Sequence, residues 1–202
     1  MKKLFLASSF KDVAVLFAQF EEDLSGKRVT FIPTASVVEK VVFYVKSGRK
    51  ALEKMGLIVD ELEVSTASRE EIASKLAHND MIYVTGGNTF FLLQALRKSG
   101  ADALIAEQVA AGKLYIGESA GAMVVAPNVE YASKMDSPKK APELEGYAGL
   151  GLVDFYPVPH RDSAPFKRAV EKILDQYAGS LPMKAMSNAQ AIVVRGDEAE
   201  VW

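Results

Sequence analysis

The run Gly117-Glu118-Ser119-Ala120-Gly121 matches the G-x-S-x-G pattern of serine hydrolases. In that pattern a sharp turn between a strand and a helix exposes the serine hydroxyl above the edge of a sheet. Leu114-Tyr115-Ile116 predicts the strand directly before the run, and the small apolar residues from Ala120 to Val125 predict the helix after it. The pattern therefore predicts Ser119 as a nucleophile. The alternative is a tight strand-to-helix turn whose serine faces solvent.

A serine nucleophile needs a base, and the chain contains only two histidines. Sites in open α/β sheets lie at the carboxyl ends of the strands. His78 precedes the predicted strand Met81–Thr85, which puts it at the opposite edge from Ser119, whereas His160 directly follows a predicted strand. We therefore predict His160 as the general base and His78 as a surface turn residue.

A transition state with a developing alkoxide requires N–H donors aimed at the oxygen. The turn Thr85-Gly86-Gly87-Asn88 follows one predicted strand and opens onto the predicted helix Thr89–Arg97. We predict an oxyanion hole made of the amides of Gly87 and Ala120. A plain glycine-rich turn, or a phosphate-binding helix N-terminus, is the alternative interpretation.

The third member of a catalytic triad holds the imidazole in the correct tautomer. Asp136 lies between the serine and the histidine in a long segment without clear periodicity, and it is the preferred candidate. Asp162 is only two residues from His160, which favours a helix-capping role. The neighbouring alternatives to Asp136 are Glu130, Glu143 and Glu145.

Composition excludes several other classes of site. The 202 residues carry a net charge of −2 with acids and bases intermixed, so neither nucleic acid nor a membrane surface is an expected partner. Cysteine is absent, which excludes disulfides and thiolate chemistry, and no histidine or carboxylate spacing suggests a metal site. The apolar run after Lys3 is too short for a signal peptide. We expect a cytoplasmic protein, monomeric or homodimeric, that needs no cofactor.

Short apolar runs alternate with helix-period segments along the chain, which predicts a mostly parallel sheet covered on both faces. One apolar stripe, Val38 to Met55, predicts a helix closed by Gly56, and Phe166 to Tyr177 forms a second. The stretch from Pro127 to Gly151 is expected to be a long loop, and loops of this length are usually functional or disordered. The predicted strands are Leu4–Ala7, Val29–Ile32, Leu57–Leu62, Met81–Thr85, Leu114–Ile116 and Leu152–Val158.

The C-terminal residues Ala191–Val194 and Ala199–Trp202 flank Arg195-Gly196-Asp197-Glu198, which predicts an antiparallel hairpin on the sheet edge. With the alternating elements before it, this hairpin completes a single domain over residues 1–202. The predicted fold class is a flavodoxin-like three-layer α/β sandwich, with the site at the carboxyl edge of the sheet.

These motifs together resemble the dipeptidase E family of serine peptidases, whose fold is similar to that of class I glutamine amidotransferases. The resemblance covers nearly the whole chain and rests on residues 83–90, on residues 115–122 and on Pro159-His160. It implies hydrolysis of short peptides with an N-terminal aspartate. It also implies Ser119 as nucleophile and His160 as base, and Met135-Asp136-Ser137-Pro138 resembles the segment that holds the family's triad aspartate.

An N-terminal aspartate requires a cation for its side chain, since burial of an unpaired charge is costly. Arg161 follows the predicted base directly, and Lys167 and Arg168 are further candidates. We predict Asn88 and Arg161 as substrate-binding residues. An esterase or amidase using the same serine and histidine, or a non-catalytic module that binds an anion or metabolite, remains the alternative function.

Overall fold

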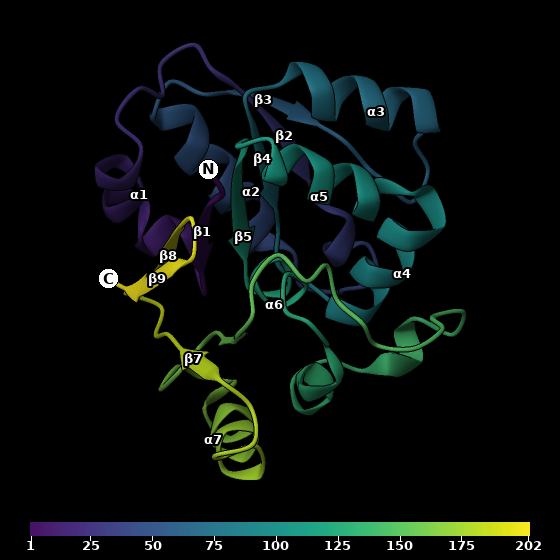
Figure 1. Ribbon diagram of the computed structural model, residues 1–202, viewed down its shortest axis with the longest axis vertical. Helices are drawn as coiled ribbons and strands as arrows, with labels where there is room; N and C mark the ends of the chain where they lie inside the picture. The colour runs from purple at the N-terminus through teal and green to yellow at the C-terminus, as the bar shows by residue number, and fades with distance from the viewer.

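A seven-stranded sheet forms the centre of the computed structural model, which describes residues 1–202 (Figure 1). Its strand order is β3-β2-β4-β5-β1-β8-β9. The first five strands in that order are parallel, β8 pairs antiparallel with β1, and β9 pairs antiparallel with β8. The strands are β1 (Lys3–Ala7), β2 (Arg28–Ile32), β3 (Ile58–Glu61), β4 (Met81–Val84), β5 (Leu114–Glu118), β8 (Ala191–Arg195) and β9 (Glu198–Val201).

Each central strand is apolar on both sides because both of its faces are covered. In β1, Leu4 and Leu6 join the larger buried cluster, while Phe5 and Ala7 join the smaller cluster on the other face. The smaller cluster includes side chains of α1 (Ala14–Phe20) and α2 (Phe43–Lys54). The larger one includes side chains of α3 (Arg69–His78), α4 (Thr89–Ser99) and α5 (Ala101–Ala110). The predicted three-layer sandwich with a mostly parallel sheet and a C-terminal hairpin is confirmed.

A second, two-stranded parallel sheet lies beyond the carboxyl ends of the main strands (Figure 1). It consists of β6 (Tyr156–Val158) and β7 (Met183–Ala185), with α7 (Lys167–Gln176) between them in the chain. The sequence correctly predicts α7, whose Val170 and Ile173 are buried. It overextends β6 to Leu152 and does not predict β7. Leu152 and Val153 are buried in the main core without forming a strand, so their apolar character reflects packing alone.

Two further segments differ in how well the sequence predicts them. The apolar stripe from Val38 predicts too long a helix, because α2 begins only at Phe43 and Val41 is 61% exposed. Val41 and Phe43 line a pocket at the carboxyl edge rather than the core. The stretch Pro127–Gly151 is a long loop as predicted, with only the short 3-10 turns η3 (Glu130–Lys134) and η4 (Pro138–Lys140). No helix has the length and apolar character needed to cross a bilayer.

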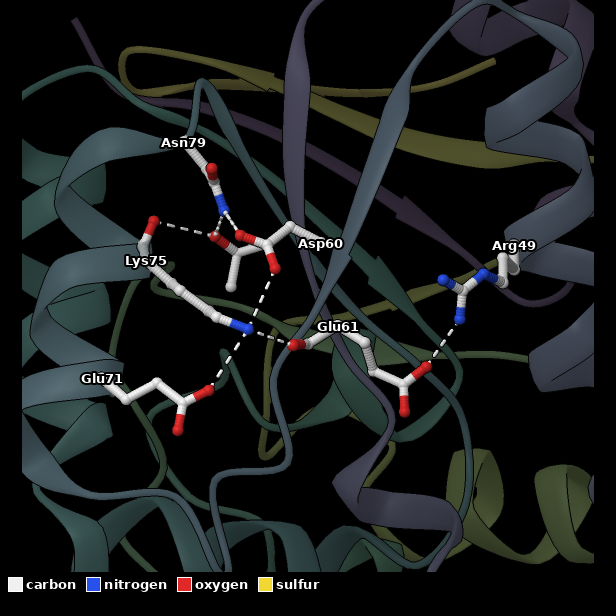
Figure 2. Close-up of polar contacts among 7 residues, drawn as sticks. Arg49, Asp60, Glu61, Glu71, Lys75 and Asn79 are labelled. Atoms are coloured by element: carbon white, nitrogen blue, oxygen red, sulfur yellow. Dashed lines mark hydrogen bonds and ion pairs between the residues drawn. The ribbon is translucent and has the colours of Figure 1, made fainter.

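A polar network lies at the edge of the sheet that β3 forms (Figure 2). Lys75 Nζ of α3 lies 2.9 Å from Asp60 Oδ1 and donates to the Glu61 carbonyl at 2.6 Å. The buried Asn79 amide donates to Asp60 Oδ2 and to Thr30 Oγ1, both at 2.9 Å. Burial acts to raise the pKa of Asp60, but the hydrogen bonds from Asn79 and Lys75 outweigh it and lower that pKa. The network thus joins α3 to β2 and β3.

We expect Asn79→Ala to lower the free energy of unfolding by about 1–3 kcal/mol, because it leaves the buried Thr30 Oγ1 without its donor and removes one of the hydrogen bonds to the partly buried Asp60. Urea denaturation measures the change. Glu71→Gln is the control, since Glu71 reaches the same Lys75 at 3.3 Å but is half exposed, and it should cost less than about 0.5 kcal/mol. Because the pKa of Asp60 is lowered by folding, its contribution should be present above the pKa of the unfolded chain and fall as the pH drops through the folded value. Equal losses in the two variants would contradict this interpretation.

Candidate active site

Ser119 lies at a strained turn between β5 and the short helix α6 (Ala120–Met123). Its backbone has φ 50° and ψ −104°, a region that costs a non-glycine residue conformational energy. The two flanking glycines allow this turn, because a Cβ on Gly117 would meet the Gly121 carbonyl oxygen within 2.4 Å, and one on Gly121 the Val84 carbonyl within 2.2 Å. The turn therefore has the geometry of a nucleophile elbow, with the serine at the carboxyl end of β5.

His160 lies beside this serine. Its Nε2 is 2.9 Å from Ser119 Oγ, within hydrogen-bonding distance. The imidazole stacks on the Phe166 ring, with 4.6 Å between centroids and 24° between planes. Burial lowers the pKa of His160 below its ordinary value, against a smaller opposite effect of its hydrogen bond with Asn188. A neutral imidazole in contact with a serine hydroxyl can act as a general base.

The other ring nitrogen of His160 faces an amide. Nδ1 lies 3.0 Å from Asn188 Oδ1, so a proton on Nδ1 would be donated to that oxygen and Nε2 would be left free to accept from Ser119. Asn188 follows β7 as His160 follows β6, and the parallel pairing of Val158 with Ala185 brings both residues to one edge. The sequence analysis missed Asn188 because it did not predict β7.

Asp136 was expected to orient His160, and the geometry does not support this expectation. Its carboxylate accepts hydrogen bonds from the Thr89 amide at 2.9 Å and from the Thr89 hydroxyl at 2.6 Å, at the start of α4. Burial raises the pKa of Asp136 to about 6, although the Thr89 hydrogen bonds oppose the rise. Sequence proximity could not distinguish a carboxylate that caps a neighbouring helix from one that meets the imidazole. The alternative residues Glu130, Glu143 and Glu145 do not line the pocket.

A buried serine of β1's carboxyl end holds the His160 backbone. Ser8 Oγ accepts the His160 N–H at 2.9 Å and lies 3.2 and 3.1 Å from the carbonyl oxygens of Met186 and Ser187. His160 itself has φ 64°, an uncommon left-handed conformation for this residue type. Ser8 thus connects the main sheet, His160 and the turn that carries Asn188. Nothing in the pattern around Ser8 indicates this role in advance.

The two predicted oxyanion donors have free N–H groups at the expected edge. Neither the Gly87 N–H nor the Ala120 N–H donates to another protein group. Gly87 has φ 139°, and a Cβ there would lie 2.1 Å from the Ala35 carbonyl oxygen, so only glycine fits this turn. The turn also packs directly on Ser119, because a Cβ on Gly86 would lie 3.2 Å from Ser119 Cβ.

A pocket of about 620 Å³ opens in front of Ser119 and His160. Its volume is typical of a small-molecule or short-peptide site. Its charged lining comes from Lys11, Asp12, Glu39, Glu118, Asp136 and Lys140. Lys140 Nζ lies 2.6 Å from Glu39 Oε1, so a cation and a carboxylate are adjacent on one wall.

Two predicted substrate-binding residues have other roles in this geometry. The side chain of Asn88 lines the pocket, but its Oδ1 accepts the Phe91 N–H as the N-cap of α4 and its Nδ2 donates to the Ser137 carbonyl. Arg161 lies outside the pocket, more than half exposed, with Nε 3.7 Å from Asp162.

His78 is an exposed residue at the end of α3, with Nδ1 2.8 Å from the Ser74 carbonyl.

Tyr44, at the first turn of α2, is a further pocket residue that the sequence did not indicate. Its buried hydroxyl has no hydrogen-bond partner in the protein. Burial raises its pKa well above the ordinary value, and the nearby carboxylates of Glu39, Glu118 and Asp136 raise it further. The hydroxyl therefore stays protonated in a part of the pocket where negative charge is concentrated.

Comparison with known proteins agrees with this geometry. The family model of peptidase family S51 matches residues 4–202. An uncharacterized peptidase of Listeria innocua is 61% identical over 198 residues, which span 98% of this chain and 95% of that protein. A Salmonella arizonae protein named peptidase E is 35% identical over 142 residues, spanning 70% of this chain and 58% of that protein.

A solved structure gives the same assignment. The crystal structure of a Listeria monocytogenes protein assigned to peptidase E superposes with a TM-score of 0.97 at 56% identity, covering 100% of this chain and 98% of that one. With the family match over almost the full length and relatives above 30% identity, the chain belongs to peptidase family S51.

Proposed function

We propose that this peptidase is a serine hydrolase in which Ser119 attacks the peptide carbonyl and His160 acts as general base. The observation that carries the proposal is the 2.9 Å contact between Ser119 Oγ and His160 Nε2 at a strained elbow. A base within hydrogen-bonding distance of a serine hydroxyl on such a turn is the arrangement required for nucleophilic catalysis.

The proposed reaction uses this geometry in two steps. His160 Nε2 takes the Ser119 proton as Oγ adds to the carbonyl carbon, and the new oxyanion accepts hydrogen bonds from the free N–H groups of Gly87 and Ala120. The imidazolium then gives its proton to the departing amine as the C–N bond breaks, which leaves an acyl-enzyme. Water, deprotonated by the same imidazole, hydrolyses the ester and returns Ser119.

Asn188 is the proposed orienting group for His160 in place of a carboxylate. An amide oxygen can accept the Nδ1 proton and hold the reactive tautomer, as in the Cys-His-Asn arrangement of papain-like proteases. Unlike a carboxylate, it does not neutralise the imidazolium that forms in the transition state. The carboxylates of Glu118 and Asp136 line the same pocket.

For specificity we propose short peptides with an N-terminal aspartate, as the family resemblance implies. The α-ammonium would be attracted to the wall formed by Asp136, Glu39 and the Tyr44 hydroxyl. The side-chain carboxylate would pair with Lys140, which lines the pocket, whereas Arg161 does not. A charge on the substrate that loses its contacts with water requires a partner of opposite sign, and this wall offers both signs.

The central test replaces the two reacting groups. Ser119→Ala and His160→Ala should each lower kcat for Asp-Leu by several orders of magnitude, and the double variant should lose little more, because the pair acts as a unit. A serine-directed phosphonate should label wild type at Ser119, as located by mass spectrometry of the digested protein. His78→Ala is the control and should stay near wild type. Activity of Ser119→Ala within tenfold of wild type would refute the proposal.

The orienting role of Asn188 is tested on the imidazole itself, since only two histidines contribute ring signals to the NMR spectrum. The Asn188 hydrogen bond acts to raise the pKa of His160. Asn188→Ala should therefore lower that pKa further, and Asn188→Asp should raise it by adding a negative partner. Asp136→Asn is the matched control and should shift it less than either change. A larger shift from Asp136→Asn would return the orienting role to that residue.

The substrate charge is tested with Lys140→Met. We expect kcat/KM for Asp-Leu to fall roughly 30-fold, which corresponds to a loss of about 2 kcal/mol in transition-state stabilisation. The substrate carboxylate would lose its partner and face Glu39 alone. Hydrolysis of Ala-Leu should change much less. Arg161→Met is the control of like charge outside the pocket, and its Asp-Leu to Ala-Leu ratio should match wild type. An unchanged ratio in Lys140→Met would show that another group recognises the aspartate.

A further inference from the structure

Phe166 covers one face of the His160 imidazole. The two rings stack with 4.6 Å between centroids and 24° between planes, and Phe166 is itself half-buried against the larger core cluster. Both ring nitrogens of His160 have other neighbours, the Ser119 hydroxyl at Nε2 and the Asn188 amide oxygen at Nδ1. The imidazole is therefore held at two edges by polar groups and on one face by an aromatic ring.

Local structure returns the Phe166 ring to the histidine. The chain turns directly after His160, where the Ser163 N–H donates to the His160 carbonyl at 3.0 Å. Phe166 then stands at the N-cap position of α7, and its carbonyl accepts the Val170 N–H at 2.9 Å. Val170 and Ile173 anchor α7 in the larger core cluster. The packing of this helix therefore fixes where the Phe166 ring lies.

A protonated His160 has no direct counter-ion in this site. Its Nδ1 faces a neutral amide and its Nε2 a hydroxyl, so neither nitrogen contacts a carboxylate. The nearby Asp162 lies instead beside the cations of Arg161 and Lys167. The charged groups around His160 are Lys11 and Asp12 of the 3-10 turn η1 (Phe10–Asp12), Glu118 of β5, Asp136 across the pocket, and Arg161, Asp162 and Lys167 between His160 and the first turn of α7.

We propose that Phe166 is a positioning residue for His160, whose ring face holds the imidazole and stabilises the imidazolium formed during the reaction through a cation–π interaction. This role rests on the proposed serine mechanism, because it is there that His160 gains a proton in the transition state. Phe166 acts through His160 and takes no part in making or breaking bonds.

The physical reason is the quadrupole of the aromatic ring. Its face is negative, and it attracts a cation that lies within about 6 Å of the ring centroid. The 4.6 Å between the Phe166 and His160 rings meets this condition. When Ser119 Oγ adds to the carbonyl carbon, its proton moves to Nε2 and the imidazole becomes a cation. Because the attraction is weaker for the neutral imidazole, the Phe166 face stabilises the transition state more than the resting enzyme.

The direction in which the pKa of His160 changes separates this role from packing alone. Burial lowers that pKa in the folded protein. A weaker attraction to the Phe166 face destabilises the imidazolium and should lower the pKa further. Loosened packing that admits water should instead raise the pKa toward its ordinary value. The two effects have opposite signs.

The test keeps the shape of the Phe166 ring and changes its charge distribution. Site-specific incorporation places phenylalanines with one, two and three ring fluorines at position 166, and each fluorine withdraws electron density from the ring face. With each fluorine the pKa of His160, measured from its NMR ring signals, should fall, and the acid limb of kcat/KM should move to lower pH. Over the series, kcat for Asp-Leu should fall about 3- to 30-fold.

Two controls isolate the ring face of Phe166. The ring signals of the exposed His78 come from the same samples and should not move. The same fluorinated residues at Phe91, a half-buried ring in the first turn of α4 that does not line the pocket, should leave kcat unchanged. Among ordinary variants, Phe166→Tyr retains an aromatic face and should keep most of the activity, whereas Phe166→Leu should not.

The outcomes distinguish the role of Phe166 from the mechanism on which it rests. If wild type neither hydrolyses peptides nor reacts with the phosphonate at Ser119, the serine mechanism itself fails, and the role of Phe166 with it. If wild type is active but the pKa of His160 and kcat stay constant across the fluorinated series, the ring acts only by packing and the inference is wrong. A pKa that falls without any change in kcat would also overturn it, because stabilisation of the imidazolium would then not affect the reaction.

Discussion

The contact between Ser119 and His160 joins two parts of the chain that share no strand pairing. The serine ends β5 of the main sheet, and the histidine follows β6 of the separate two-stranded sheet. Their alignment depends on how the two-stranded β6–β7 sheet packs against the carboxyl edge of the main sheet. Ser8 fixes that packing, because its Oγ accepts the His160 N–H and lies within hydrogen-bonding distance of the Met186 carbonyl. Further support comes from the buried Tyr131, whose hydroxyl donates to the Pro157 carbonyl at 2.6 Å. The geometry of the Ser119–His160 pair is thus a property of this interface.

The sequence predicts well whatever depends on local pattern. Both faces of the central strands are buried, so their apolar runs stand out, and the glycines around Ser119 occupy positions where a Cβ would collide with backbone. The choice of His160 over His78 needed only the direction of parallel strands, and in the structure His160 lies beside Ser119 whereas His78 is exposed. Strands with a regular apolar pattern, and turns in which only glycine fits, can therefore be predicted from one sequence.

What the sequence could not supply depends on packing between distant segments. Asn188 meets His160 only because β6 and β7 pair in parallel, and β7 is a three-residue, half-buried strand with no clear alternation. Asp136 was a reasonable triad candidate by order along the chain, but its carboxylate bonds Thr89, which is separated from it by 47 residues. Val41 is apolar yet exposed and lines the pocket, so it imitates the core face of a helix that begins only at Phe43. In each case the sequence gives the type of residue but not the group that its side chain contacts in the fold.

The pocket combines the neutral amide of Asn188, the proposed orienting group, with the carboxylates of Glu118 and Asp136. The pKa of Asp136 is raised to about 6 and that of Glu118 to about 7, both by burial. Such groups are costly to ionise in the empty pocket, and an ammonium group placed beside Asp136 would favour its ionised form. Substrate binding and carboxylate ionisation would then be linked, each strengthening the other by the same free energy. A carboxylate in place of Asn188 would add a further negative charge to this crowded region and raise its ionisation cost. In the proposed mechanism the Asn188 amide orients His160 without that cost, which gives a physical reason for an amide in a pocket that two carboxylates line.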